Sequence, residues 1–319
     1  MNLKVFTLFS AILFACNITL AQDYAFKVLG SKGNPTSNGA VLKVGSKIMP
    51  TQLIVLGEGA SLDLATPANK VVNLSKAGSY KAQDLVAQAS SQKNLTNDYA
   101  KYVISELTSD NDNAVTAKNK FNHMNKTGSV KRATGMVVAM LPEKSKIYGN
   151  SIVLKWFVKD NLTLTEPIDR YKVELQNMED KVLFSKEVTE TNLTIDLNKE
   201  KISETIMICR IYPIGKNGNS LETAIVDGNM LVKTEDLEAR EISAELVNIS
   251  KSQNSSSLSK LIEARFFEEK ELYADAITSY EEALKLSEST EQYKRIYNLF
   301  LDRNGLSKEA MAAAAESKE

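Results

Sequence analysis

Residues 151–158 have the sequence SIVLKWFV, which places apolar side chains at every second position and contains the single tryptophan, Trp156. Successive side chains of a β-strand point to opposite faces, so this alternation predicts a half-buried strand. Further alternating or apolar runs follow, separated by turn-forming residues, at 171–175, 181–188, 193–197 and 205–214. Short strands at this spacing predict an antiparallel β-sandwich with Trp156 in its core.

The chain has 319 residues, which is too long for one small core and predicts several modest domains. Hydrophobic residues make up 43% and charged residues 25%, as is usual for a folded protein. The 39 Lys and Arg residues nearly balance the 40 Asp and Glu residues, for a net charge of -1. This balance predicts no partner among nucleic acids and no broad attraction to an anionic membrane surface.

Residues 1–21 have the pattern of a secretory signal peptide. Lys4 provides a positive start, an apolar segment covers 5–15, and Ala21 is a small residue at the expected cleavage site. The alternative is an uncleaved anchor, but the apolar segment is shorter than the roughly 20 residues that a membrane-spanning helix needs. We therefore expect export, a periplasmic or cell-envelope location, and no membrane span in the mature chain.

The two cysteines are Cys16 and Cys209. Cys16 follows Phe14 and Ala15, whereas the bacterial lipoprotein box has a small residue two positions before the cysteine, so a lipid anchor at Cys16 is disfavoured and is the second alternative. Cleavage of the signal would leave Cys209 without an intramolecular partner. Its neighbours in an apolar strand predict a buried, inert thiol, because reactive cysteines need polar or cationic surroundings.

Residues 22–108 are expected to form a β-rich domain with trailing helices. Short apolar runs predict strands at 26–29, 41–44, 53–56, 61–64 and 71–74, and helical spacing of apolar residues follows at 83–107. We expect these helices to pack on the preceding sheet.

The motifs LKVG at 42–45, LIV at 53–55, GASLDL at 59–64 and VVNL at 71–74 make this segment similar to the FecR-type β domain. The resemblance implies a periplasmic β module. We expect neither the cytoplasmic anti-sigma segment nor the transmembrane helix of FecR proteins, which speaks against a signalling role.

Residues 109–134 are polar and rich in asparagine, which predicts a linker. The only histidine, His123, lies there without a second histidine or cysteine nearby and is expected to be exposed. Residues 135–249 are expected to form the β-sandwich. Pro142, SIVLKW at 151–156, YKVEL at 171–175, and RIYPI followed by GKNGNS at 210–220 resemble a fibronectin type III or immunoglobulin-like module. Such modules are mostly spacers and binding platforms.

Residues 250–256 are expected to form a second linker, and 257–319 are strongly helical in pattern. Ala264, Phe267, Ala276, Tyr280 and Ala283 have the offsets of a tetratricopeptide repeat, which this segment resembles. A shift of 34 residues gives partial self-similarity: Ile262 matches Ile296, Phe266 matches Phe300, and Glu271 matches the turn residue Gly305.

One complete and one partial repeat unit cannot bury their own apolar face. This predicts a face that something else must cover, formed by Ile262, Phe266, Tyr273, Ile277 and Tyr280. The sandwich, a second copy of the chain and a protein partner are three alternatives. We expect the helices to keep part of this face for a protein partner.

The sequence thus predicts a multidomain α+β protein with a β-rich N-terminal domain, an antiparallel β-sandwich and C-terminal helical repeat hairpins. It contains no recognisable nucleophile constellation, metal-ligand spacing or phosphate-binding glycine loop, so we expect no enzymatic activity, no cofactor and no metal. We expect a bacterial cell-envelope adaptor or scaffold. The alternatives are a FecR-like sensor that reads a partner receptor and, more remotely, a hydrolase with acids on distant strands.

Overall fold

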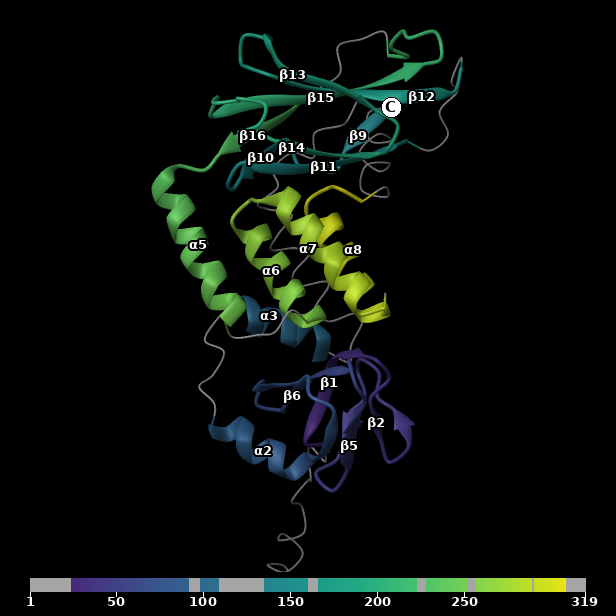
Figure 1. Cartoon of the computed structure of the whole chain (residues 1–319), viewed down its shortest axis with the longest axis vertical. Helices are drawn as coiled ribbons and strands as arrows, with labels where there is room; N and C mark the ends of the chain where they lie inside the picture. The colour runs from purple at the N-terminus through teal and green to yellow at the C-terminus, as the bar shows by residue number, and fades with distance from the viewer. Residues whose placement is uncertain are drawn as a thin grey trace, which may run out of the picture.

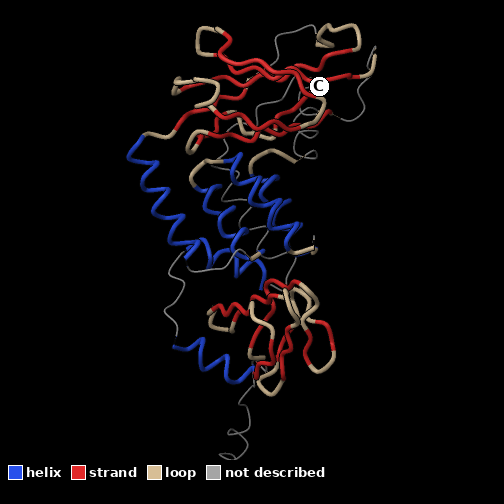
Figure 2. The backbone as a smooth tube through the Cα atoms, in the orientation of Figure 1, coloured by secondary structure: helices blue, strands red, loops and turns tan. Residues whose placement is uncertain are grey.

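The computed structural model describes residues 24–91, 98–108, 135–159, 166–222, 228–251, 256–288 and 290–307. These residues form a multidomain α+β fold with three layers along its long axis (Figure 1). A β-rich N-terminal module lies at one end, a β-sandwich lies at the other, and a layer of helices separates them. Figure 2 shows the same order, with strands at both ends and helices between them.

The N-terminal module contains two four-stranded antiparallel sheets, in the orders β4-β1-β6-β7 and β3-β2-β5-β8. Their inward side chains, among them Phe26, Ile54 and Leu62, are fully buried in one core with Leu85 of the following helix. Four of the five expected strands are present, whereas the run expected at 41–44 is a strand only at Val41, because a turn closed by the hydrogen bond from Ser46 N–H to the Lys43 carbonyl follows it. Three further strands accompany them. The strands are β1 (Phe26–Lys32), β2 (Thr36–Ser37), β3 (Ala40–Val41), β4 (Lys47–Ile48), β5 (Leu53–Leu56), β6 (Ser61–Ala65), β7 (Val71–Leu74) and β8 (Gly78–Lys81).

The sandwich pairs a five-stranded sheet, β10-β16-β15-β12-β13, with a three-stranded sheet, β14-β11-β9. Trp156 is 2% exposed in the core and meets the ring of Tyr171 edge-on at 5.5 Å, as the alternation predicted. The expected antiparallel pairing has one exception, because β10 and β16 are parallel. The strands are β9 (Val137–Ala139), β10 (Lys144–Ile147), β11 (Ser151–Val158), β12 (Ile168–Gln176), β13 (Val182–Val188), β14 (Asn192–Asp196), β15 (Ile206–Gly215) and β16 (Asn229–Lys233).

Six helices are described, and five of them form the helical layer. Apolar side chains at helical spacing face one shared core. This core also contains Leu29, Val44 and Ala65 of the N-terminal module. Helix α2 packs instead on the N-terminal module, as expected. The helices are α2 (Ala82–Ser91), α3 (Asp98–Thr108), α5 (Asp236–Lys251), α6 (Ser257–Glu269), α7 (Tyr273–Leu286) and α8 (Glu291–Arg303).

Two helices lie in the helical layer although the sequence assigned them to the β domains. Helix α3 was expected on the preceding sheet, but it packs chiefly on α6, where Tyr99 meets Phe266 edge-on at 5.4 Å. Helix α5 falls within the range 135–249 expected for the sandwich, yet Ile242 and Ile249 are buried in the helical core. Both helices are amphipathic, and their apolar sides pack with α6 in one core.

The 34-residue self-similarity is visible in the backbone. After α6, the N–H groups of Lys270, Glu271 and Leu272 donate to the carbonyls of Phe266, Glu268 and Phe267. After α8, residues 304–306 repeat these three hydrogen bonds at positions 34 residues later. Glu271 (φ 62°) and Gly305 (φ 67°) both adopt the left-handed conformation that ends each helix. The equivalence inferred from the sequence is therefore structural, whereas residues 308–319 lie outside the described residues.

Candidate functional site

The five residues expected on an exposed partner-binding face are instead largely buried within the chain. Ile262, Phe266, Ile277 and Tyr280 are each 2% exposed or less, and Tyr273 is half-buried between the helical and sandwich cores. The face does need cover, as predicted, but the chain itself supplies it. The expectation that part of this face stays available for a protein partner was wrong for these residues, because it treated the C-terminal helices as an isolated unit. Helices α3 and α5 and the N-terminal module supply the cover that two repeat units lack.

A buried ion cluster holds the helical layer together. Glu268 of α6 accepts hydrogen bonds from Arg303 of α8, with Nη2–oxygen distances of 2.9 and 3.0 Å, and forms an ion pair with Arg265 at 2.9 Å. The Tyr280 hydroxyl donates to the same carboxylate at 3.1 Å. Burial opposes ionisation of Glu268, but the two guanidinium groups outweigh it, so the pKa of this carboxyl lies below its usual value.

The cluster also fixes α3. The Arg265 guanidinium lies 4.6 Å from the centre of the Tyr102 ring, and Arg303 donates to the Tyr102 hydroxyl at 3.2 Å. The cluster therefore joins α3, α6, α7 and α8. The Glu268 carboxylate and the guanidinium groups of Arg265 and Arg303 all have partners within the cluster, which favours a structural role over catalysis.

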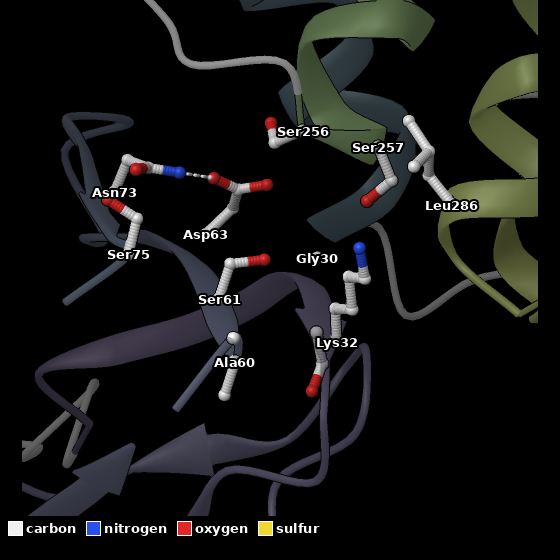
Figure 3. A pocket seen from close by; sticks show the side chains of 12 residues that line it. Gly30, Lys32, Ala60, Ser61, Asp63, Asn73, Ser75, Ser256, Ser257 and Leu286 are labelled. Carbon is white, nitrogen blue, oxygen red and sulfur yellow. Dashed lines mark hydrogen bonds between the residues drawn. The ribbon is translucent and has the colours of Figure 1, made fainter. Parts of the chain in front are cut away.

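A second buried carboxylate marks the junction between the N-terminal module and the helical layer (Figure 3). Asp63 of β6 is 4% exposed and accepts a hydrogen bond from Asn73 Nδ2 at 2.5 Å. Ser256 and the backbone N–H of Leu258, at the start of α6, also bond to it. A carboxylate at a helix N-terminus meets the unpaired N–H groups and the positive end of the helix dipole. Asp63 therefore binds the start of a helix whose first residue, Ser257, lies 194 positions later in the chain.

The surroundings of Asp63 are closely packed. A Cβ atom on Gly30 would lie 2.6 Å from Asp63 Oδ2, so only glycine allows this approach. Tyr293 of α8 donates its hydroxyl to the Leu29 carbonyl at 3.0 Å and has a second hydrogen bond with Ser257 Oγ at 3.1 Å. Burial raises the pKa of Asp63 despite its hydrogen bonds.

Beside Asp63 is a polar cavity of about 200 Å³. Lys32, Ser61 and Ser257 border it together with Asp63 and Asn73, as Figure 3 shows. The Asp63 carboxyl group occupies the place at the helix terminus that an external anion would need. The arrangement thus serves to join two layers rather than to bind phosphate.

The helical layer also has an open groove between α5, α6 and α7, with a volume of about 430 Å³. Leu246, Val247 and Phe267 provide apolar surface, and Lys260 pairs with Glu263 at 2.8 Å and with Glu282 at 3.0 Å. Ser243, Asp275, Thr278 and Ser279 complete the lining. We call this surface the α5–α7 groove.

Asp275, in the first turn of α7, is the unusual acid of the groove. Burial raises its pKa to about 7, even though its own backbone N–H bonds to it and the helix dipole favours its ionised form. The described residues show no ion pair for this carboxyl. Nothing in the sequence singles out Asp275, because an acid in the first turn of a helix is ordinary. A basic group placed in the groove would restore its charge.

The remaining sequence expectations concern single residues. Cys209 is buried, and burial raises the pKa of its thiol to about 12, in agreement with an inert thiol. His123 lies outside the described residues. Within those residues, no three His, Cys, Asp or Glu side chains come together as a metal site, and no helix is long and apolar enough to cross a membrane.

Comparison with known proteins adds no relative to this description. No family model matches the chain, and no curated protein matches its sequence.

Proposed function

We propose that the chain is a non-catalytic adaptor or scaffold of the bacterial cell envelope, which holds a protein partner in the α5–α7 groove. The groove carries the proposal because it is an open, mixed apolar and acidic surface on the helical layer. This differs from the face predicted from the sequence, which the chain itself covers. We therefore place the partner-binding surface on the side of these helices adjacent to the buried face that contains Phe266.

The chemistry of the groove specifies the partner. Three acids, Glu263, Asp275 and Glu282, line the groove together with one lysine, Lys260, and with apolar residues. The lysine is already paired with Glu263 and Glu282, whereas Asp275 is not. A segment with an apolar side chain and a nearby Lys or Arg would bury the apolar residues and meet Asp275. Val247, which is 43% exposed, lines the groove at its exposed edge.

The layered construction supports a scaffold role. Hydrogen bonds and shared core residues connect the helical layer to the N-terminal module, and ion pairs connect it to the sandwich. A partner in the groove would therefore have a defined position relative to both β modules. Modules of the expected types act mostly as spacers and binding platforms.

A photo-crosslinking side chain at position 247 tests this proposal. In an envelope extract it should capture one protein species, and Asp275→Asn should reduce the yield. The matched control carries the crosslinker at Met178, which is 61% exposed on the distant sandwich and should not capture that species. The same capture from both positions, or none from position 247, contradicts the adaptor role.

The FecR-like sensor is the second candidate, and the Asp63 junction favours it. A ligand that moved the N-terminal module would disturb the start of α6 directly. In that case the species captured from position 247 would be an envelope receptor or its sigma-factor regulator. Capture of any other protein supports the adaptor over the sensor.

A further inference from the structure

The near-neutral net charge of the chain conceals a separation of charge between its layers. Residues 24–91 contain seven lysines, no arginine and three acids, for a net charge of +4. The other described residues contain 23 Lys and Arg against 29 Asp and Glu, for a net charge of -6. The excess positive charge thus lies at one end of the long axis, on the N-terminal module (Figure 1).

The lysines of this module are mostly at its surface. Five of the seven are exposed, namely Lys32, Lys43, Lys47, Lys76 and Lys81. Of the three acids, Asp63 is buried in the junction with α6, which leaves Glu58 and Asp84 exposed. The exposed charged residues of the module are therefore five lysines and two acids, for a net charge of +3.

The same module exposes an apolar sheet face. In the sheet β3-β2-β5-β8, Thr36 pairs with both Val41 and Val55, so these three side chains point to one face. Leu53 lies two residues from Val55 on the same strand and therefore shares that face. Val41, Leu53 and Val55 are 41–46% exposed, while the alternate residue Ile54 is fully buried. We call the surface formed by Thr36, Val41, Leu53 and Val55 the outer face.

Lysines border the outer face directly. Lys81 of β8 is the cross-strand neighbour of Leu53. Beyond the end of β3 the alternation continues, with Val41 and Lys43 exposed and Leu42 buried. Aliphatic side chains surrounded by lysines complement a surface that is negatively charged outside and apolar beneath.

Two kinds of partner have such a surface: an anionic bilayer and an acidic protein. Protein interfaces are enriched in Tyr, Trp and Arg and depleted in Lys. The outer face has the opposite composition, with aliphatic residues and lysines, and residues 24–91 contain no arginine. Lysine attracts anionic headgroups without fixed geometry, and its long stem lies along apolar surface while its charge stays in water. The composition favours a bilayer.

We propose that the outer face of the N-terminal module binds the surface of an anionic phospholipid bilayer, with Val41, Leu53 and Val55 at the acyl boundary and Lys43 and Lys81 at the headgroups. The anionic bilayer would repel the acidic remainder of the molecule, and this repulsion would orient the long axis away from the membrane. This mode needs no lipid anchor and no spanning helix. It is independent of the adaptor role and of any protein in the α5–α7 groove.

Co-sedimentation with vesicles tests the proposal. The chain from Gln22 contains every described residue and lacks the apolar signal segment, so it is the form to use. It should bind vesicles of equal parts phosphatidylglycerol and phosphatidylcholine and should not bind phosphatidylcholine alone. Lys43→Glu with Lys81→Glu should reduce the partition coefficient at least about tenfold, because each lysine at an anionic surface contributes severalfold.

The control Lys181→Glu with Lys216→Glu makes the same change of net charge at exposed positions of the sandwich and should leave binding unchanged. Leu53→Thr with Val55→Thr keeps the charge and residues suited to a strand, and should weaken binding severalfold. Circular dichroism confirms that each variant is folded.

Three results would overturn the proposal. The first is equal binding to neutral and anionic vesicles. The second is an equal loss of binding from the sandwich control, which would indicate attraction by net charge alone. The third is indifference to anionic vesicles together with lysine-dependent retention on poly-glutamate, which would assign the outer face to an acidic protein.

Discussion

The helical layer joins its two neighbours by different physical means. Towards the N-terminal module the contact is buried: Tyr293 bonds to the Leu29 carbonyl, Asp63 meets the start of α6, and Leu29, Val44 and Ala65 belong to the helical core. Towards the sandwich the shared apolar contact is smaller: Ala274 of α7 is buried in the sandwich core, and Tyr273 packs against both cores.

The sandwich contact relies more on exposed charges. Lys146 of β10 pairs with Glu238 of α5 at 2.7 Å, and Lys155 of β11 pairs with Glu281 of α7. The side chains of these pairs are between 19% and 41% exposed. One backbone hydrogen bond, from Lys146 N–H to the Glu271 carbonyl at 2.9 Å, accompanies them.

This difference predicts unequal strength. Exposed ion pairs contribute little to stability, and salt screens them, whereas a buried polar group that loses its partner costs the full desolvation of that group. We expect the N-terminal module and helical layer to behave as one cooperative unit. We expect the sandwich to unfold more independently. The following predictions, in order of decreasing effect, test this contrast.

Trp156→Ala should cost roughly 3–5 kcal/mol of sandwich stability, as for other large-to-small aromatic changes in a core. Hydrogen exchange should show the loss in β11 and β12, with β1 and α3 still protected. Phe157→Ala removes a similar ring from the opposite, half-buried side of β11 and should cost less. Equal loss of protection in β1 would show that the two ends unfold together.

Glu268→Gln should cost about 3 kcal/mol, because it leaves Arg265 and Arg303 without their buried carboxylate. Protection should fall together in α3, α6 and β1. The exposed neighbour Glu269, which pairs with Arg265 at 3.2 Å, provides the control Glu269→Gln with little effect. The pKa of Glu268 is lowered, so its contribution should be lost as pH falls through its folded-state pKa.

Tyr293→Phe should cost about 1–2 kcal/mol, because the ring stays while the Leu29 carbonyl loses its buried donor. Urea denaturation measures the change. Tyr297→Phe, which removes a longer 3.4 Å contact to Glu281, should cost less. Equal costs would remove the evidence that the N-terminal junction is the stronger one.

Asp275→Asn should stabilise the protein by about 1 kcal/mol above pH 7, since a neutral amide avoids burying a charge. The folded pKa of about 7 exceeds the ordinary 3.8, so the native state binds more protons between these values. Wild-type stability should therefore decrease as pH rises from about 4 to 7, and the advantage of Asn should grow over that range and then level off. Urea midpoints of both proteins across this range provide the test; a constant difference would contradict it.

Glu281→Gln should have the smallest effect, about 0.2–1 kcal/mol, because the pair with Lys155 is partly exposed. The effect should disappear at high salt. Thermal melting at low and high ionic strength measures it. An effect that is large and insensitive to salt would mean that the sandwich junction is as firmly built as the N-terminal one.

The sequence located the elements whose pattern is local. Alternation predicted β11 to β15 and four N-terminal strands, and the 34-residue offset predicted the equivalence of Glu271 and Gly305. Both patterns depend on side chains only two to four positions apart, or on a repeated unit, which a single sequence displays directly. The multidomain α+β class followed from the same patterns.

Tertiary structure alone decided what covers each apolar face. Phe266 has the same helical spacing whether α3 or a separate protein packs on it, so its burial could not be read from the sequence. Asp63 lies in a strand motif, and the helix terminus that it caps is distant in sequence. Periodicity identifies which side of an element is apolar, whereas the identity of the covering surface depends on contacts between residues up to 264 positions apart, such as Leu29 and Tyr293.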